Sequence, residues 1–271
     1  MNTLILELKK VRANFRTYFG IIILWGLGVL IGINVWYNPS LVPLRQFGFH
    51  LSGLYVPGLT LYPLAVVGPV VTVLIAGESI AGERIRGTLR MVLSKPVTRQ
   101  QFYMGKVYLI IVYSFFIVFS TLLVTAVLGL ILFGGGEVIL PNELSNFSEG
   151  FFNVPAEEAL WRLASSGIAV SLYVLAFASV ALFFSSFLNH SLASPVFTLV
   201  MTTAFTVLEN LEFFRPFAPY LITHHFLYWQ NFMVHEIDWL GFFSSLGVVM
   251  VYIAGGIIGG GLIFRYRDET D

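Results

Sequence analysis

Residues 77–106 read GESIAGERIRGTLRMVLSKPVTRQQFYMGK and carry eight charged side chains. The segments on either side, 46–77 and 107–136, contain no Asp, Glu, Lys or Arg. A helix needs about 20 mostly apolar residues to cross the roughly 30 Å hydrocarbon layer of a membrane. Because each uncharged segment exceeds that length, the pattern predicts two membrane spans joined by a charged connection.

The rest of the chain repeats this alternation of long uncharged segments and short charged ones. Of its 271 residues, 57% are hydrophobic and 11% are charged, against roughly 25% charged in a soluble domain. One uncharged interval, 163–208, is long enough for two spans, and the sequence LNHS at 188–191 divides it. We therefore expect an all-α membrane protein, a single transmembrane domain over residues 1–271, with six transmembrane helices at 18–36, 60–77, 107–133, 163–187, 192–211 and 240–264.

The basic residues predict which ends of the spans face the cytoplasm, since cytoplasmic loops retain Lys and Arg. With the amino terminus inside, three of the 15 basic residues lie outside, namely Arg45, Arg162 and Arg215. The inner twelve are Lys9, Lys10, Arg12, Arg16, Arg84, Arg86, Arg90, Lys95, Arg99, Lys106, Arg265 and Arg267. We expect a multi-pass protein of the cell membrane with cytoplasmic N and C termini. Its outer loops are 134–162 and 212–239, the second forming short helices.

The composition excludes several kinds of site. The chain has no cysteine, which rules out disulfides, thiolate nucleophiles and thiolate metal ligands. Its formal net charge is zero, so no global field favours nucleic acid, and we expect no nucleic-acid partner. The histidines and acids of the second outer loop do not have a recognised ligand spacing, so no metal site is expected there. These residues are His224, His225, His235, Glu236 and Asp238.

The first residues form a predicted surface helix. Apolar residues recur at i, i+4, i+7 and i+11 from Leu4 to Phe15, so residues 1–16 are expected to lie as an amphipathic helix on the inner membrane surface. This interface helix either anchors the first span, with membrane lipid as its partner, or also contacts a cytoplasmic protein. Its basic residues are Lys9, Lys10, Arg12 and Arg16.

The charged connection is predicted to be helical. Helix-forming residues from Glu78 to Leu93 indicate that the second span continues beyond the membrane and stops before Pro96, because proline disfavours a helical predecessor. Thr98 and Gln101 have the spacing of a capping box, so a new helix is expected to start there and run into the third span. A plain connector needs only a few residues. We therefore expect another protein to dock on this cytoplasmic elbow, residues 78–106.

The elbow resembles the cytoplasmic signature of type 2 ABC exporter permeases: an acid, then Glu-Arg, Gly-Thr-Leu, Pro-Val, Arg and Gly-Lys. The matching positions are Glu78, Glu83, Arg84, Gly87, Thr88, Leu89, Pro96, Val97, Arg99, Gly105 and Lys106. The six spans and the inside termini extend the resemblance over most of the chain. In that family the elbow fits a cleft on an ATPase subunit. The resemblance thus implies a set of ATPase-coupling residues: Glu78, Glu83, Arg84, Arg86, Gly87, Thr88, Arg90, Pro96, Arg99 and Lys106.

The resemblance also implies a division of labour. The permease pairs with a second permease copy, as a homodimer in preference to a heterodimer, and binds two ATP-binding-cassette ATPase subunits. A Walker A loop, Gly-x-x-x-x-Gly-Lys-Ser/Thr, occurs nowhere in the chain, since Gly105 and Lys106 are followed by Val107. We therefore expect no catalytic residue and no cofactor in this chain, with ATP and Mg²⁺ held by the partner ATPase.

The fifth predicted span carries a polar stripe on one helical face. The stripe comprises Thr198, Thr202, Thr206 and Glu209. In one interpretation the threonines bond to their own helix backbone and Glu209 reaches the outer interface. In the other, the stripe lines a substrate path at the dimer interface.

Three other functions remain open from the sequence. They are an ATP-independent channel or secondary transporter, an intramembrane enzyme, and a non-transporting component of a signalling or assembly complex. The nearly uncharged spans argue against the first two, which need embedded charges or convergent polar groups. An exporter of an amphipathic, lipid, peptide, drug or ion substrate is the leading hypothesis.

Overall fold

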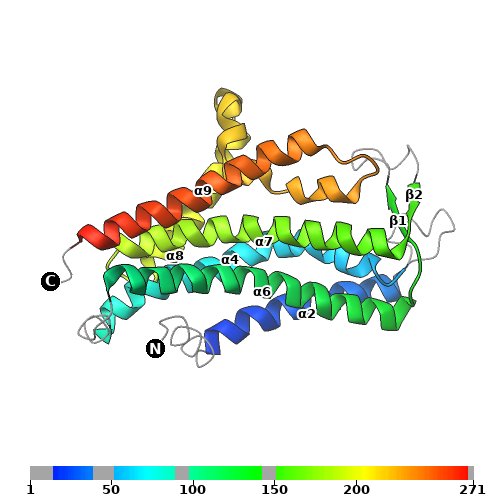
Figure 1. Cartoon of the computed structure of the whole chain (residues 1–271), viewed down its shortest axis with the longest axis horizontal. Coiled ribbons are helices and arrows are strands. Elements are labelled where there is room, and N and C mark those ends of the chain that lie inside the picture. Colours follow the sequence, from blue (N-terminus) through cyan, green and yellow to red (C-terminus); the bar gives the residue numbers. More distant parts are fainter. Residues whose placement is uncertain (1–14, 39–51, 89–97, 142–150, 268–271) are drawn as a thin grey trace.

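The structure is a computed structural model of the chain and describes residues 15–38, 52–88, 98–141 and 151–267. Its long helices run along the longest axis of the molecule (Figure 1). Among the described residues, five helices are long and apolar enough to cross a membrane, and α8 is shorter. The α-helices are α2 (Phe15–Tyr37), α4 (Tyr55–Ile85), α6 (Arg99–Phe133), α7 (Ala156–Phe187), α8 (Ala193–Glu209) and α9 (Trp239–Tyr266).

The uncharged segments form helices because a helix satisfies its backbone hydrogen bonds within its own segment. Hydroxyl groups in the spans follow the same rule. Thr121 donates to the Ile117 carbonyl at 2.7 Å, and Ser171 donates to the Gly167 carbonyl at 2.7 Å. These polar side chains therefore need no partner on a neighbouring helix.

Five of the six predicted spans lie inside the five long helices; they are 18–36, 60–77, 107–133, 163–187 and 240–264. The range 192–211 is occupied by α8, which has 17 residues. At 1.5 Å per residue such a helix is about 25 Å long, less than the roughly 30 Å hydrocarbon layer. By length the structure supports five spanning helices, and the sixth span stays a prediction.

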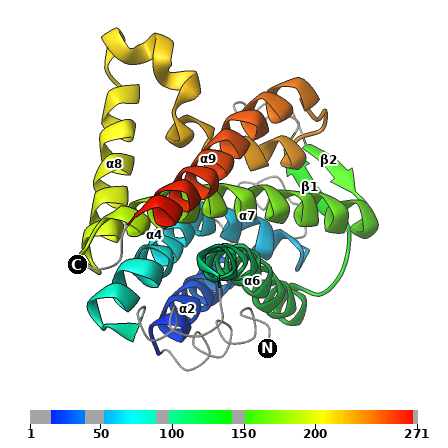
Figure 2. The same cartoon turned by 60° about the vertical axis from the view of Figure 1, so that its left-hand side comes forward.

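Helix α7 is the centre of the bundle. It packs against α4, α6 and α9, and Figure 2 shows it between α9 on one side and α4 and α6 on the other. Val170, Val174 and Leu182 of α7 are completely buried. At Gly256 of α9, an added Cβ would lie 2.6 Å from the backbone of Ser179 in α7. The absence of a side chain at this glycine lets the two helices approach closely.

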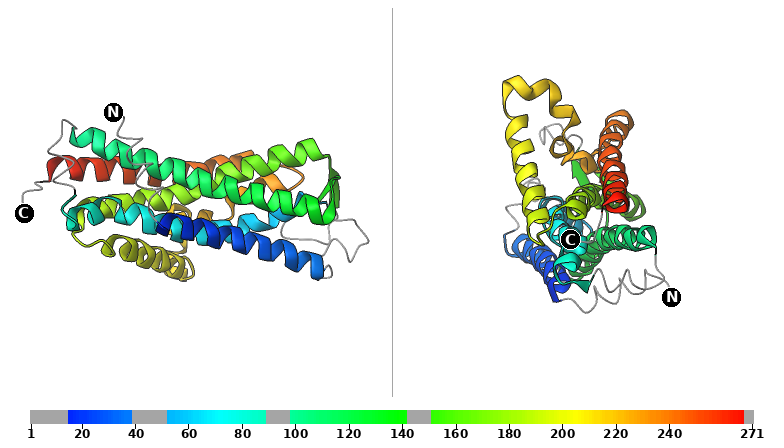
Figure 3. Two further views of the ribbon diagram at one scale, coloured as in Figure 1. Left: turned by 90° about the horizontal axis from the view of Figure 1, so that it is seen from below. Right: turned by 90° about the vertical axis from the view of Figure 1, so that its left-hand side faces the viewer.

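The two ends of the bundle have different chemistry (Figure 3, left). At the basic end, α4 and α7 finish, α6 begins, and three arginines gather: Arg84, Arg99 and Arg267. At the strand end, β1 (Val138–Pro141) and β2 (Phe151–Val154) pair antiparallel. This small sheet departs from the expected all-α fold. It lies outside the helical bundle, and its two strands satisfy each other's backbone groups.

Three short 3₁₀ helices connect α8 to α9, as expected for short helices in this segment. They are η3 (Glu212–Tyr220), η4 (Ile222–His225) and η5 (Tyr228–Met233). Pro216 and Pro219 lie inside η3, where their missing N–H groups oppose a continuous α-helix. Helix α8 and η3 project from the side of the bundle (Figure 3, right), while η5 packs on α7 and α9.

Candidate functional site

The predicted elbow begins where α4 leaves the core of the bundle. Helix α4 ends at Ile85, and Gly87 has a φ of 67°. That left-handed conformation suits glycine and stops a helix. Continuation of the second span beyond residue 77 is confirmed, but an unbroken helix to Leu93 is wrong at Gly87. Two predicted coupling residues, Arg90 and Pro96, lie outside the described residues.

The other arm of the elbow starts with the predicted capping box. The Thr98 hydroxyl accepts a hydrogen bond from the Gln101 N–H at 3.2 Å, and the Gln101 side chain accepts one from the Thr98 N–H at 3.1 Å. Two amide donors at the start of α6 are thereby satisfied. The sequence prediction of a new helix at this point is confirmed.

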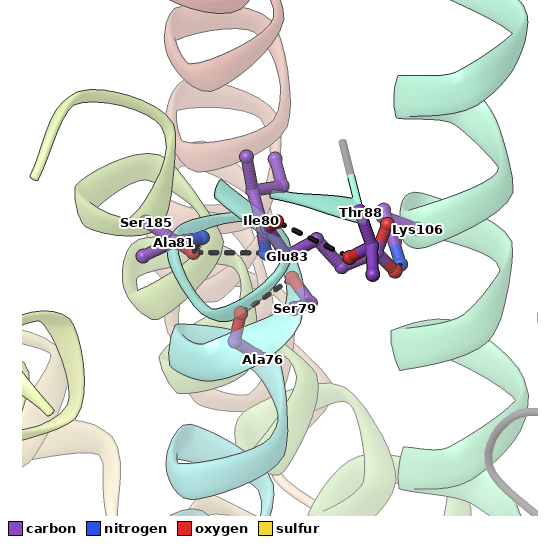
Figure 4. Close-up of polar contacts among 8 residues, drawn as sticks. All are labelled: Ala76, Ser79, Ile80, Ala81, Glu83, Thr88, Lys106 and Ser185. Carbon is purple, nitrogen blue, oxygen red and sulfur yellow. Dashed lines mark hydrogen bonds and ion pairs between the residues drawn. The ribbon is translucent and has the colours of Figure 1, made fainter. Parts of the chain in front are cut away.

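A buried ion pair joins the two arms at the base of the elbow. Lys106 Nζ of α6 lies 2.5 Å from Glu83 Oε1 of α4, with side chains 3% and 8% exposed. The ammonium group also lies 5.1 Å from the centre of the Phe102 ring. Figure 4 shows the pair between the two helices, with the Thr88 hydroxyl bonded to the Glu83 carbonyl at 3.2 Å. A buried charge is costly without a partner, so the pair favours one arrangement of α4 against α6.

Arginines at the basic end bind the carboxyl end of α7. Arg84 donates to the carbonyls of Leu188 at 3.0 Å and Ser186 at 3.1 Å. Arg267 donates to the Phe187 carbonyl, and Arg99 donates to the Arg267 carbonyl at 2.6 Å. The last carbonyls of a helix lack intrahelical partners and carry partial negative charge. The guanidinium groups of Arg84 and Arg267 therefore fasten α4 and α9 to α7, and that of Arg99 fastens α6 to the end of α9.

A serine of α7 makes a further tie to α4. The Ser185 hydroxyl oxygen accepts hydrogen bonds from the N–H groups of Ile80 at 3.2 Å and Ala81 at 3.0 Å (Figure 4). The preceding residue, Ser79, donates to the Ala76 carbonyl at 2.6 Å, one turn earlier in α4. The segment of α4 that leads into the elbow is thus held by α7 at its backbone as well as at Arg84.

The structure divides the predicted coupling residues into two groups. Glu83, Arg84, Arg99 and Lys106 have partners inside the chain. Arg86 and Gly87 are exposed, and Glu78 and Thr88 are half-buried. The pattern of charges along the chain does not indicate this division. For the predicted interface helix, residues 1–14 with Lys9, Lys10 and Arg12 lie outside the described residues, and Arg16 lies in the first turn of α2.

The strand end contains a buried arginine that the sequence analysis did not single out. Arg162 of α7 pairs with Glu158 at 2.8 Å and donates to the carbonyls of Phe232 at 3.2 Å and Val234 at 2.5 Å. Its guanidinium also lies 5.6 Å from the centre of the Phe152 ring in β2. One side chain therefore joins α7, η5 and the small sheet. Its isolation among apolar residues was the available signal.

The polar stripe of α8 is satisfied largely within its own helix. Thr198 donates to the Ser194 carbonyl at 2.9 Å, and Thr202 and Thr206 repeat this four-residue pattern at 2.8 and 3.1 Å. Glu209, at the end of the stripe, accepts a hydrogen bond from the Thr223 hydroxyl of η4. The backbone bonding of the threonines matches the first of the two interpretations given above.

Comparison with known proteins identifies the relatives of the chain. A family model described as ABC-2 family transporter protein matches residues 9–268. The chain belongs to the ABC-2 transporter family. The resemblance seen in residues 78–106 is thereby confirmed. ABC-2 family membership, together with five helices long enough to span a membrane, identifies the chain as a membrane protein of a transporter family.

A curated relative matches part of this ABC-2 protein. It is Uncharacterized protein YhcI of Bacillus subtilis (strain 168), 27% identical over 154 residues. The match covers 56% of the chain and 48% of the relative, so the chain spans about half the length of the relative that it matches.

Proposed function

We propose that this chain is the permease subunit of an ABC exporter, which dimerises, binds two ATPase subunits at the basic end and moves its substrate outward. The observation that carries the proposal is the Glu83–Lys106 pair at the base of the elbow. It joins α4 to α6 where both helices leave the bundle. A force applied to the elbow is then shared by α4 and α6, and the contacts of Arg84 and Ser185 pass it on to α7.

The proposed orientation places the basic end in the cytoplasm of the cell, together with both termini. The twelve-to-three distribution of Lys and Arg supports it, because positive charge is retained on that side. ATP and Mg²⁺ belong to the partner ATPase in this proposal. Among the described coupling residues, the exposed Arg86 and Gly87 are the candidates for direct contact, while Glu83, Arg84, Arg99 and Lys106 hold the elbow in position.

An exposed apolar face on α8 supports the proposed homodimer. Its residues line an open hollow of about 560 Å³, and Val200 within it is 63% exposed. Between membrane helices, association depends on close packing, which small residues permit. Thr203 and Ala204 in the middle of the face would let the second copy approach. The face comprises Leu199, Val200, Thr203, Ala204, Val207 and Leu208.

Copurification tests the proposed function. The tagged chain is co-expressed with a candidate ABC ATPase, isolated in detergent and returned to lipid to measure ATP hydrolysis. The mass of the complex should correspond to two copies of each chain. Arg86→Glu should lower ATPase retention several-fold, because it reverses an exposed charge on the elbow. Arg215→Glu, an equally exposed arginine on η3, is the matched control and should leave retention unchanged.

Two results would count against the proposal. If no ABC ATPase is retained by the wild-type chain, the assignment as an ATPase-coupled permease is wrong. If Arg86→Glu and Arg215→Glu retain the ATPase equally well, the docking surface lies elsewhere.

A further inference from the structure

The end of α8 lies beside the middle of the bundle. The helix begins near the basic end, where a Cβ at Gly77 of α4 would lie 2.6 Å from the Pro195 ring, and it ends after 17 residues. Beyond it, the Tyr220 carbonyl accepts a hydrogen bond from the Tyr252 hydroxyl at 3.1 Å. Tyr252 is thirteen residues from one end of α9 and fourteen from the other. The arm formed by α8, η3 and η4, yellow in Figure 1, therefore meets the bundle half-way along its length.

This position puts the Glu209 carboxylate deeper than the outer interface expected from the sequence. Its oxygen accepts the hydrogen bond from Thr223, and it interacts electrostatically with Tyr173 of α7 and His225 of η4. The ion pairs between described residues are Glu83–Lys106 and Glu158–Arg162, so no described cation pairs with Glu209.

The neighbouring histidine does not supply a positive charge. His225 is 8% exposed and shares a 2.9 Å hydrogen bond with the Pro219 carbonyl. Burial lowers the pKa of His225 from its ordinary value of 6.5, although the Pro219 carbonyl and Glu209 oppose that shift. Burial therefore disfavours the charged imidazolium form of His225.

A chain of aromatic rings begins at Tyr173, whose hydroxyl interacts electrostatically with this carboxylate. The Tyr173 ring, which belongs to a side chain 4% exposed, lies 6.2 Å from the Phe226 ring. The Phe226 ring lies 5.2 Å from the Tyr62 ring of α4. The faces of such rings carry negative potential and attract cations, most strongly where water is excluded.

An organic cation fits these groups better than a metal ion. A carboxylate at membrane depth without a cationic partner is unfavourable, and a bound positive charge would offset that cost. Metal ions require several oxygen, nitrogen or sulfur ligands, yet the described residues contain no group of three or more His, Cys, Asp or Glu. A cation with apolar substituents needs one carboxylate and aromatic faces.

We propose that Glu209, with the rings of Tyr173 and Phe226, binds the positive charge of a lipophilic organic cation, and that such cations are the substrate class of the transporter. The claim that these cations are transported rests on the proposed function. Their binding at Glu209 does not, because binding requires no ATPase.

Equilibrium binding to the purified full chain in phosphatidylcholine nanodiscs tests the site, with empty nanodiscs subtracted. The probes are tetraphenylphosphonium and tetraphenylborate, which have the same shape and opposite charge. The wild-type chain should bind the phosphonium saturably and prefer it over the borate. Glu209→Gln should weaken phosphonium binding at least tenfold. Glu212→Gln, three residues further on and exposed, is the matched control and should bind as the wild type does.

Two results overturn the site: no saturable phosphonium binding by the wild-type chain, or affinities of Glu209→Gln and wild type within twofold. If Glu209→Gln does not fold, the comparison of the two probes on the wild-type chain tests the site. Equal binding of phosphonium and borate would exclude a carboxylate-based site. None of these measurements involves the ATPase, so failure of the site and failure of the proposed function are distinguishable.

Discussion

The basic end and the strand end of the bundle are held by different kinds of contact. At the basic end, arginines bind helix carbonyls and a buried ion pair joins α4 to α6. At the strand end, aromatic rings fill the space, with the centres of the Phe232 and Phe242 rings 4.8 Å apart. Among the described residues of that end, Arg162 is a buried charged residue. Hydrogen bonds from charged groups require particular distances and angles, whereas packed aromatic rings can shift relative to one another with less loss of contact. The difference indicates that the basic end fixes the register of its helices more strictly than the strand end does.

The largest effect is expected from Lys106→Met, which breaks the buried pair and leaves the Glu83 carboxylate without its ammonium partner. Removing one partner of such a pair costs about 3–5 kcal/mol. Unfolding by SDS in mixed micelles, followed by circular dichroism, measures the loss.

The double variant Glu83→Gln with Lys106→Met is the control, because it removes both charges of the pair. It should recover more than half of the lost stability. A double variant as unstable as Lys106→Met would mean that the pair does not set the stability of the basic end.

A smaller loss is expected at the strand end from Arg162→Gln. This change removes charge-assisted hydrogen bonds to the Phe232 and Val234 carbonyls, which should cost about 2–3 kcal/mol in the same unfolding assay. Glu158 is 38% exposed, so its ion pair contributes little. Glu158→Gln should therefore cost less than about 1 kcal/mol. Equal losses in the two variants would show that the ion pair, and not the carbonyl contacts, holds this end.

The smallest effect is expected from Thr98→Ala, which removes the hydroxyl of the capping box. Loss of such a cap costs about 1 kcal/mol. Amide hydrogen exchange should accelerate in the first turn of α6, and Thr98→Ser, which keeps the hydroxyl, should exchange as the wild type does. Unchanged exchange in Thr98→Ala would show that contacts elsewhere at the basic end fix the start of α6.

The sequence predicted those features that depend on local pattern. The length of the uncharged segments identified five helices, and the spacing of Thr98 and Gln101 identified the start of α6. The family followed from a run of residues that are close together in the chain. In each case the deciding residues lie within one segment, so no knowledge of tertiary contacts was required.

Features that depend on distant partners were not predictable. Arg84 and Arg99 bind groups 104 and 168 residues away, and a pattern of charges does not distinguish an arginine that binds its own chain from one that binds another protein. The strands are four residues long, too short for an alternating pattern to separate them from a loop. The depth of Glu209 was missed because apolar length says nothing about the tilt of α8.

The contacts of the basic end can form only after both partners have been synthesised. Contacts between residues close in sequence therefore become possible before contacts between distant ones. Glu83 and Lys106 are 23 residues apart, so a nascent hairpin of α4 and α6 contains both charges. The acceptor of Arg84 at Leu188 follows 104 residues later. At roughly 5–20 residues per second, the ribosome needs about 5–20 s to deliver it. During that interval Arg84 lacks its acceptors at the end of α7, and its positive charge favours the membrane surface over the hydrocarbon until α7 arrives.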